Sequence, residues 1–183
     1  DKMVLGQHFV SDSNGKEYGI KRGEGRKPIS DEVLDLYAES IIAAIKAGIP
    51  DVIAHPDLFM QARDEFGEIE KQITAAICDC AIKHGIPLEI NFGKIASKVD
   101  SGMSIEDIKK MTPYPSPEFW KFVAKNYGKA VTVIFGKDAH FPDQLSTERD
   151  YEIAKAIMGE ETLEQLHIVT SYRELEEARN ITF

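Results

Sequence analysis

Four short apolar runs in this chain each lead to a polar residue of a type that binds metals or substrates. These residues are His8 after the run 2–5, His55 after 51–54, Asn91 after 87–90, and Asp138 with His140 after 130–135. In parallel α/β barrels, the chemistry is built from loops at the C-terminal ends of the strands, so each strand is followed by a functional side chain and then by a helix. The repetition predicts that these residues meet at one end of a parallel sheet.

The segments between the apolar runs predict helices, which makes the chain an alternating α/β fold. We expect strands at 2–5, 51–54, 87–91, 130–135 and 166–169, helices at 31–47, 66–84, 117–127, 146–158 and 171–179, a Gly-rich loop at 11–27 and a short helix after Ser104. Strands that alternate with helices form a parallel sheet. Five strands are fewer than the roughly seven or eight that close a barrel. The sequence therefore predicts a partial barrel within a single domain, residues 1–183.

The composition limits the partners and the compartment of the protein. The 183 residues carry a net charge of -9, which argues against binding to nucleic acid. No apolar stretch reaches the roughly 20 residues that span a bilayer. The chain has two cysteines, Cys78 and Cys80, and we expect no secretory signal. Both features suit a reducing cytoplasm, so we expect a cytoplasmic protein without nucleic-acid or membrane partners.

Asp138 and His140 form the sharpest local signal, because an Asp-x-His motif after a strand projects both side chains toward one end of the sheet. A carboxylate and an imidazole suit Zn, Mn or Fe. The alternative is that Asp138 caps a helix and His140 lies on the surface. Pro56 follows His55 and predicts an extended backbone there; a ligand role and a structural role for His55 are equally open. Asp57 is expected to be a turn or cap residue.

Other polar positions carry weaker signals. Glu89 lies inside an apolar strand, where an unpaired carboxylate is costly. It either orients a metal-ligating histidine from behind or pairs with a core Lys or Arg. Asn91 either hydrogen-bonds a substrate or closes a turn. His8 follows Gly6-Gln7, and a glycine lets the backbone pass close to a ligand.

As a set, five motifs in this order and spacing resemble those of the PHP (polymerase and histidinol phosphatase) family, with the closest likeness to its histidinol-phosphatase branch. The motifs are Leu5-Gly6-Gln7-His8-Phe9, Ile53-Ala54-His55-Pro56-Asp57-Leu58, Leu88-Glu89-Ile90-Asn91, Tyr114-Pro115-Ser116-Pro117 and Gly136-Lys137-Asp138-Ala139-His140. They extend over nearly all of the chain, and their combination is specific.

The resemblance implies a (β/α)7 barrel with two or three divalent metals, Zn, Mn or Fe, at the C-terminal ends of the strands. Members of the family hydrolyse phosphoesters with a metal-activated water. By this resemblance His8 and His55 share one metal, Asp138 binds a second metal, and His140 binds a third. Asp138 and His140 are accordingly the expected catalytic residues, as ligands of the reacting metals.

The resemblance also places Tyr114 and Ser116 on the substrate side of the site, and Asn91 is the further candidate for a substrate contact. Two positions depart from the family pattern. Lys137 stands where the family has a Ser before the Asp-x-His motif, and Gln7 stands where it has a Ser before His8. Lys137 would pair with a phosphate or occupy a metal-like position.

The first ligands of the family, a His-x-His motif, a further His and an acidic residue, do not occur ahead of His8 in this chain. We therefore expect the C-terminal part of a PHP phosphoesterase with its N-terminal strands missing, which binds metal incompletely and is inactive alone. A small phosphorylated substrate, with L-histidinol phosphate first, is expected for the intact protein, and exposed barrel edges would favour homo-oligomers. The alternative is a non-catalytic remnant that binds metal or phosphate, or an interaction domain. A PHP module that serves a DNA polymerase is disfavoured by the acidic charge.

Overall fold

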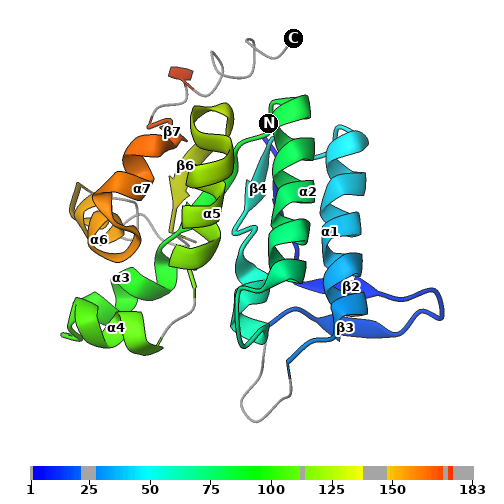
Figure 1. Ribbon diagram of the computed structural model, residues 1–183, viewed down its shortest axis with the longest axis horizontal. Coiled ribbons are helices and arrows are strands. Elements are labelled where there is room, and N and C mark those ends of the chain that lie inside the picture. The colour runs from blue at the N-terminus through cyan, green and yellow to red at the C-terminus, as the bar shows by residue number, and fades with distance from the viewer. Residues whose placement is uncertain (1, 22–27, 112–113, 138–147, 171–172, 175–183) are drawn as a thin grey trace.

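The computed structural model describes residues 2–21, 28–111, 114–137, 148–170 and 173–174, and these form an α/β fold on a parallel sheet (Figure 1). The strands are Val4–Gly6 (β1), Val52–Ala54 (β4), Leu88–Asn91 (β5), Thr132–Gly136 (β6) and His167–Ile168 (β7). They lie in the order β1-β4-β5-β6-β7, and all neighbours are parallel. The expected alternation of strands and helices is confirmed. Within the described residues the sheet is open, with β1 and β7 at its edges.

Four helices form a chain of contacts in which each helix packs on the next. Helix α1 (Asp31–Lys46) packs on α2 (Glu68–His84), α2 packs on α5 (Pro117–Tyr127), and α5 packs on α7 (Glu160–Gln165). Figure 1 shows α1, α2 and α5 side by side in front of the sheet. The other helices are α3 (Gly93–Asp100), α4 (Ile105–Met111) and α6 (Glu148–Met158), with 3-10 turns at Leu58–Ala62 (η1) and Gly128–Ala130 (η2).

The expected helix starts are confirmed at three helices. Ser30 occupies the N-cap of α1 with an extended backbone, although its side chain makes no capping bond. The Ser116 hydroxyl caps α5 by accepting a hydrogen bond from the Phe119 N–H, at 3.2 Å. Ser104 caps α4 in the same way through the N–H of Asp107, also at 3.2 Å. Such caps satisfy backbone donors that have no partner inside the helix.

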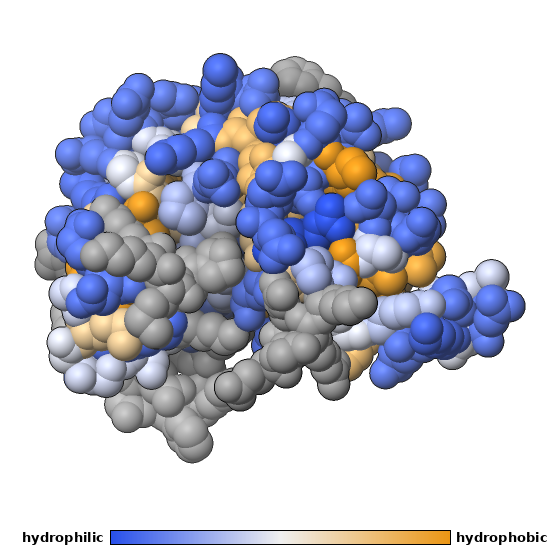
Figure 2. All heavy atoms as spheres, turned by 60° about the horizontal axis from the view of Figure 1, so that its bottom comes forward, coloured by the Kyte–Doolittle hydropathy of each residue, from blue (hydrophilic) through white to orange (hydrophobic). Residues whose placement is uncertain are grey.

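The Gly-rich segment 11–27 was expected to be a loop, and this is wrong for its first half. Strand β2 (Phe9–Ser11) pairs antiparallel with β3 (Glu17–Gly19). The Asp12 carboxylate closes the turn by accepting the N–H groups of Asn14 and Lys16, at 2.9 and 3.0 Å. Three-residue strands are too short for an alternating pattern to stand out. The hairpin protrudes from the body of the molecule, on a mostly hydrophilic face (Figure 2).

Two helices, α3 and α7, were not expected as separate elements. Helix α3 begins directly after β5, in a segment that the sequence predicted as mixed loop, and α7 fills the stretch before β7. The helix expected at 171–179 lies outside the described residues, apart from 173–174. In the part of the chain that the structure describes, no helix is long and apolar enough to cross a membrane.

Burial differs sharply between the central strands and the first edge strand. All residues of β4 and β5 are buried, as expected for parallel strands covered on both faces. At the β1 edge, Met3 and Val4 remain 53% and 59% exposed. This edge therefore presents apolar side chains that nothing in the described structure covers.

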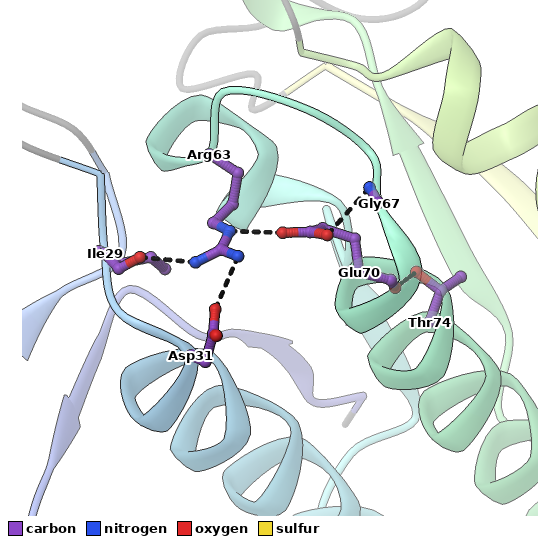
Figure 3. A network of polar contacts seen from close by, with 6 residues as sticks. All are labelled: Ile29, Asp31, Arg63, Gly67, Glu70 and Thr74. Atoms are coloured by element: carbon purple, nitrogen blue, oxygen red, sulfur yellow. Dashed lines mark hydrogen bonds and ion pairs between the residues drawn. The ribbon is translucent and has the colours of Figure 1, made fainter.

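A partly buried ion-pair network holds the start of α1 against the start of α2 (Figure 3). The guanidinium of Arg63 donates to the Ile29 carbonyl at 2.7 Å and to the Asp31 carboxylate at 2.8 Å, and it pairs with Glu70. The other Glu70 oxygen accepts the N–H of Gly67 at 3.0 Å. The network fixes the chain that follows η1 and so stabilises the loop on the C-terminal side of β4.

Candidate functional site

His8 and His55 lie together at the C-terminal ends of two neighbouring parallel strands. His8 follows β1 and His55 follows β4, with Gly6 in register with Ala54. The centroids of the two imidazole rings are 4.8 Å apart, and the rings meet edge to face at 61°. His55 is buried and His8 is half-buried. Residues 47 positions apart in sequence are thus brought together by the pairing of β1 with β4.

Gly6 lies directly against the imidazole rings of both His8 and His55. A Cβ atom at this position would lie 3.1 Å from both Cε1 and Nε2 of His55, and 3.4 Å from Nε2 of His8. Contacts of 3.1 Å are tighter than side chains ordinarily make. Both Nε2 atoms therefore lie within contact distance of the same backbone position, and the glycine gives the rings the room to do so.

The His8 backbone is held by the hairpin, and the His55 backbone by the neighbouring strand. The carbonyl of His8 accepts the N–H of Ile20, at 2.9 Å, so β3 fixes the chain just after β1. The N–H of His55 donates to Glu89 Oε2 on β5, at 3.0 Å. The His55 carbonyl in turn accepts the N–H of Leu58, at 2.9 Å, which begins η1.

The extended backbone expected at His55 from the following Pro56 is wrong. His55 has a φ of 35°, in the left-handed region that residues other than glycine rarely enter. Such a conformation costs about 1–3 kcal/mol and persists only where the surroundings impose it. Here the bonds to Glu89 and Leu58 hold both backbone groups of His55, and this tertiary constraint outweighs the local preference set by proline.

The Glu89 carboxylate occupies space that a side chain at Gly136 of β6 would otherwise fill. A Cβ on Gly136 would lie only 1.6 Å from Glu89 Oε1, so no larger residue fits while Glu89 keeps its place. Glu89 Oε2 also accepts the side-chain amide of Asn91, at 3.3 Å, and Asn91 Oδ1 accepts the N–H of Gly93, at 3.1 Å. Glu89 therefore holds the backbone N–H of His55, and Asn91 closes the turn after β5. That Glu89 orients a metal-ligating histidine stays a prediction.

Asp57 is the functional candidate that the sequence did not single out. It lies in the turn before η1, at the N-cap position, as expected of a turn or cap residue, and in addition its side chain is fully buried. Asp57 Oδ2 accepts the N–H of Ser116 at 2.6 Å and the indole N–H of Trp120 at 3.2 Å. Burial raises the pKa of Asp57 to about 7, against these bonds, which lower it. The available signal was its position between Pro56 and three apolar residues, 58–60, where a surface turn is out of place.

Tyr114 lies against His55, and Ser116 lies near it in sequence and is bound to Asp57. The Tyr114 ring is buried, with its centroid 6.4 Å from that of His55, and Ser116 is buried at the start of α5. On the α1 side, the Tyr37 hydroxyl donates to the carbonyl of Pro56, at 3.0 Å. His55 is therefore enclosed by His8, Tyr114 and the turn at Pro56.

The remaining predicted site residues are not placed against this pair. Asp138 and His140 lie outside the described residues, and Lys137 is half-buried directly after β6. Two residues that were not expected to belong to the site are His84, exposed at the end of α2, and Cys78, buried within that helix. Across the described residues, no group of three or more His, Cys, Asp and Glu side chains is arranged to hold a metal.

The imidazoles of His8 and His55 nevertheless suit a metal as two of its ligands. Two imidazoles converge over a glycine, and the backbone of one is fixed by a carboxylate. Imidazole nitrogens are ligands that suit Zn and Fe. Comparison with known proteins identifies no family, because no family model, no curated protein and no solved structure matches the chain. The likeness to PHP motifs stays a prediction from the sequence.

Proposed function

We propose that this chain is the C-terminal part of a metal-dependent phosphoesterase of the PHP type, with a small phosphomonoester as substrate and L-histidinol phosphate as the first candidate. The observation that carries the proposal is the contact between His8 and His55, whose rings are 4.8 Å apart at the ends of β1 and β4. These residues belong to two separate motifs of the set that resembles the family, and the fold brings them to one place.

The sheet supports a barrel of the (β/α)7 type as the complete architecture. The parallel strands lie in sequence order. With the right-handed crossovers that parallel strands generally have, this order would place successive helices on the same face, which is the arrangement of a barrel. A further strand paired with β1 would cover the exposed side chains of Met3 and Val4. We place the additional strands of the barrel, with the first ligands that the resemblance implies, at this edge.

In the proposed site, His8 and His55 hold one metal, and Asp138 and His140 hold the others. Bound divalent metals supply a hydroxide nucleophile at neutral pH and neutralise charge on the phosphate. Gly6 leaves the space in which the two imidazoles converge, and Glu89 fixes the direction of His55 through its backbone. Lys137 would offer a positive charge for a phosphate oxygen. Tyr114 and Ser116 would form the substrate side of the site.

A phosphatase assay tests the proposal. The protein, in this form and in a form extended before β1, is assayed against a panel of phosphomonoesters with Zn, Mn or Fe and after treatment with a chelator. We expect the extended form to be active and metal-dependent, and the 183-residue chain to have negligible activity. His55→Ala should abolish activity, whereas His84→Ala, in an exposed position on α2, should not.

If neither form of the protein hydrolysed any phosphoester with any of these metals, the proposed phosphatase activity would be excluded. If metal binding to His8 and His55 persisted in such a protein, the chain would be a non-catalytic metal-binding domain, which is the alternative function. If binding were also absent, both functions would be excluded.

A further inference from the structure

The structure assigns Asp57 the role of a positioning residue that holds Tyr114 against His55. The carboxylate stands at the end of the turn that carries His55, and its partners belong to the start of α5. It joins parts of the chain that are 59 and 63 residues apart, through the N–H of Ser116 and the indole N–H of Trp120. The consequence for catalysis rests on the proposed function, but the structural role does not.

The bond to Ser116 anchors the chain next to Tyr114. Ser116 is two residues from Tyr114, and its N–H lies 2.6 Å from Asp57 Oδ2, a short contact for an amide and a carboxylate. The Ser116 hydroxyl is already engaged with the N–H of Phe119, so its backbone N–H and its side chain have separate partners. One end of the segment 114–116 is thereby fixed to the turn after β4, beside His55.

The bond to Trp120 makes the anchor rigid. The indole is fully buried and donates to the same oxygen at 3.2 Å, one helical turn beyond Ser116. Two donors on α5 converge on one carboxylate oxygen, so the helix cannot rotate or slide without losing both bonds. The other oxygen, Oδ1, is buried and accepts no hydrogen bond within the described structure. This buried tie lies two residues from His55 in sequence.

The turn that carries Asp57 is also held by contacts to its backbone, one of them from α1. The Tyr37 hydroxyl on α1 donates to the Pro56 carbonyl, at 3.0 Å, and the N–H of Met60 donates to the Asp57 carbonyl, also at 3.0 Å. Asp57 therefore transmits the position of α1 and β4 to the start of α5. In an active protein, Tyr114 would be held where it shapes the substrate side of the site without contacting the metal.

The direct test is NMR of the metal-free chain, which requires no enzymatic activity. Ring protons of Tyr114 and His55 are expected to give a nuclear Overhauser effect in the wild type. Asp57→Asn retains an oxygen for both donors and should retain this signal. Asp57→Val is similar in size but has no acceptor, and it should lose the signal while the far-UV circular dichroism stays folded.

Trp120→Phe is the matched control. It removes one buried bond to Asp57 and some core volume, but it leaves the bond from Ser116, so the Tyr114–His55 signal should persist. A folded Asp57→Val protein with an unchanged signal would overturn the inference. If Asp57→Val does not fold, two other results would overturn the inference. One is loss of the Tyr114–His55 signal in folded Asp57→Asn. The other is hydrogen exchange of the wild-type Ser116 amide with solvent at the rate of an unprotected amide.

Kinetics of the active, extended protein separate this role from the proposed function. Asp57→Val should raise KM on the order of tenfold with a smaller change in kcat, and Asp57→Asn should restore KM. An equal loss of kcat and kcat/KM in Asp57→Val would contradict positioning of the substrate wall. Absence of phosphatase activity in the wild type, with the NMR results as expected, would remove the proposed function and leave the positioning role intact.

Discussion

The backbone N–H of His55 donates a hydrogen bond to the carboxylate of Glu89, with 3.0 Å between the two atoms. This bond joins β4 to β5 just where His55 adopts a φ of 35°. A left-handed residue before a proline is unfavourable on its own, so the bond stabilises the geometry that turns the imidazole toward His8.

Replacement of Glu89 tests this relationship. Glu89→Leu removes the acceptor and should lower the free energy of unfolding by about 2–4 kcal/mol, because a buried N–H loses its partner. Glu89→Gln retains an oxygen and should cost much less. Urea denaturation measures both, with Glu118→Ala, in an exposed position on α5, as a control expected within about 0.5 kcal/mol of the wild type. Equal losses for Leu and Gln would contradict this role.

Gly136 and Glu89 should be energetically coupled. Gly136→Ala places a Cβ where Glu89 Oε1 now lies, 1.6 Å away, and should destabilise the protein by more than about 2 kcal/mol. In a Glu89→Ala background the same change should be nearly neutral, which a double-mutant cycle measures as a coupling of at least about 1 kcal/mol. Additive effects would show that the Glu89 side chain does not occupy the space next to Gly136.

Asp57 predicts a pH dependence of stability in the metal-free protein. Its pKa is about 7 in the fold and close to 4 in an unfolded chain. Below about pH 4 both states hold the proton. Between about pH 4 and 7 only the folded state holds it, so unfolding releases a proton and the Asp57 contribution to stability falls as pH rises.

Asp57→Asn has no such titration, so it isolates this contribution from those of the other carboxylates. Its stability relative to the wild type should increase from pH 4 to 7 and then level off. Urea denaturation across this range, with a chelator present, gives the difference. A difference that does not change with pH would contradict the raised pKa.

Arg63 should be the most sensitive ion-pair residue of the scaffold. Arg63→Ala leaves the buried Glu70 carboxylate without its partner and should cost about 2–4 kcal/mol. Lys71→Ala removes only the exposed pair with Glu68, at 3.9 Å, and should cost less than about 0.5 kcal/mol. Thermal or urea unfolding distinguishes them, and similar losses would show that the network in Figure 3 contributes little.

The sequence predicted the alternating fold well because its signals are local. Apolar runs, the caps at Ser104 and Ser116, and helical periodicity each depend on neighbours within a few residues. The hairpin at 9–19 was not predicted, because its strands are three residues long and its turn depends on one side chain, Asp12.

The site was predictable only in part, since its details depend on distant contacts. The positions of His8 and His55 after strands could be read from the sequence. The left-handed backbone of His55 and the hydrogen-bond partners of Asp57 could not, because Glu89, Ser116 and Trp120 lie 34 to 63 residues away. Their influence exists only once the sheet and α5 are assembled.

The most direct test of the account is a Co(II) titration of this chain, followed by visible absorption of the metal-histidine complex. We predict weak binding, because a catalytic zinc-type site normally has three protein ligands and His8 with His55 supply two. Either His8→Ala or His55→Ala should lower the affinity at least tenfold, and His84→Ala should leave it unchanged. Unchanged Co(II) affinity in the His8→Ala/His55→Ala double variant would contradict the claim that these two histidines share a metal, and tight binding at several complete sites in the wild-type chain would contradict the incomplete ligand set.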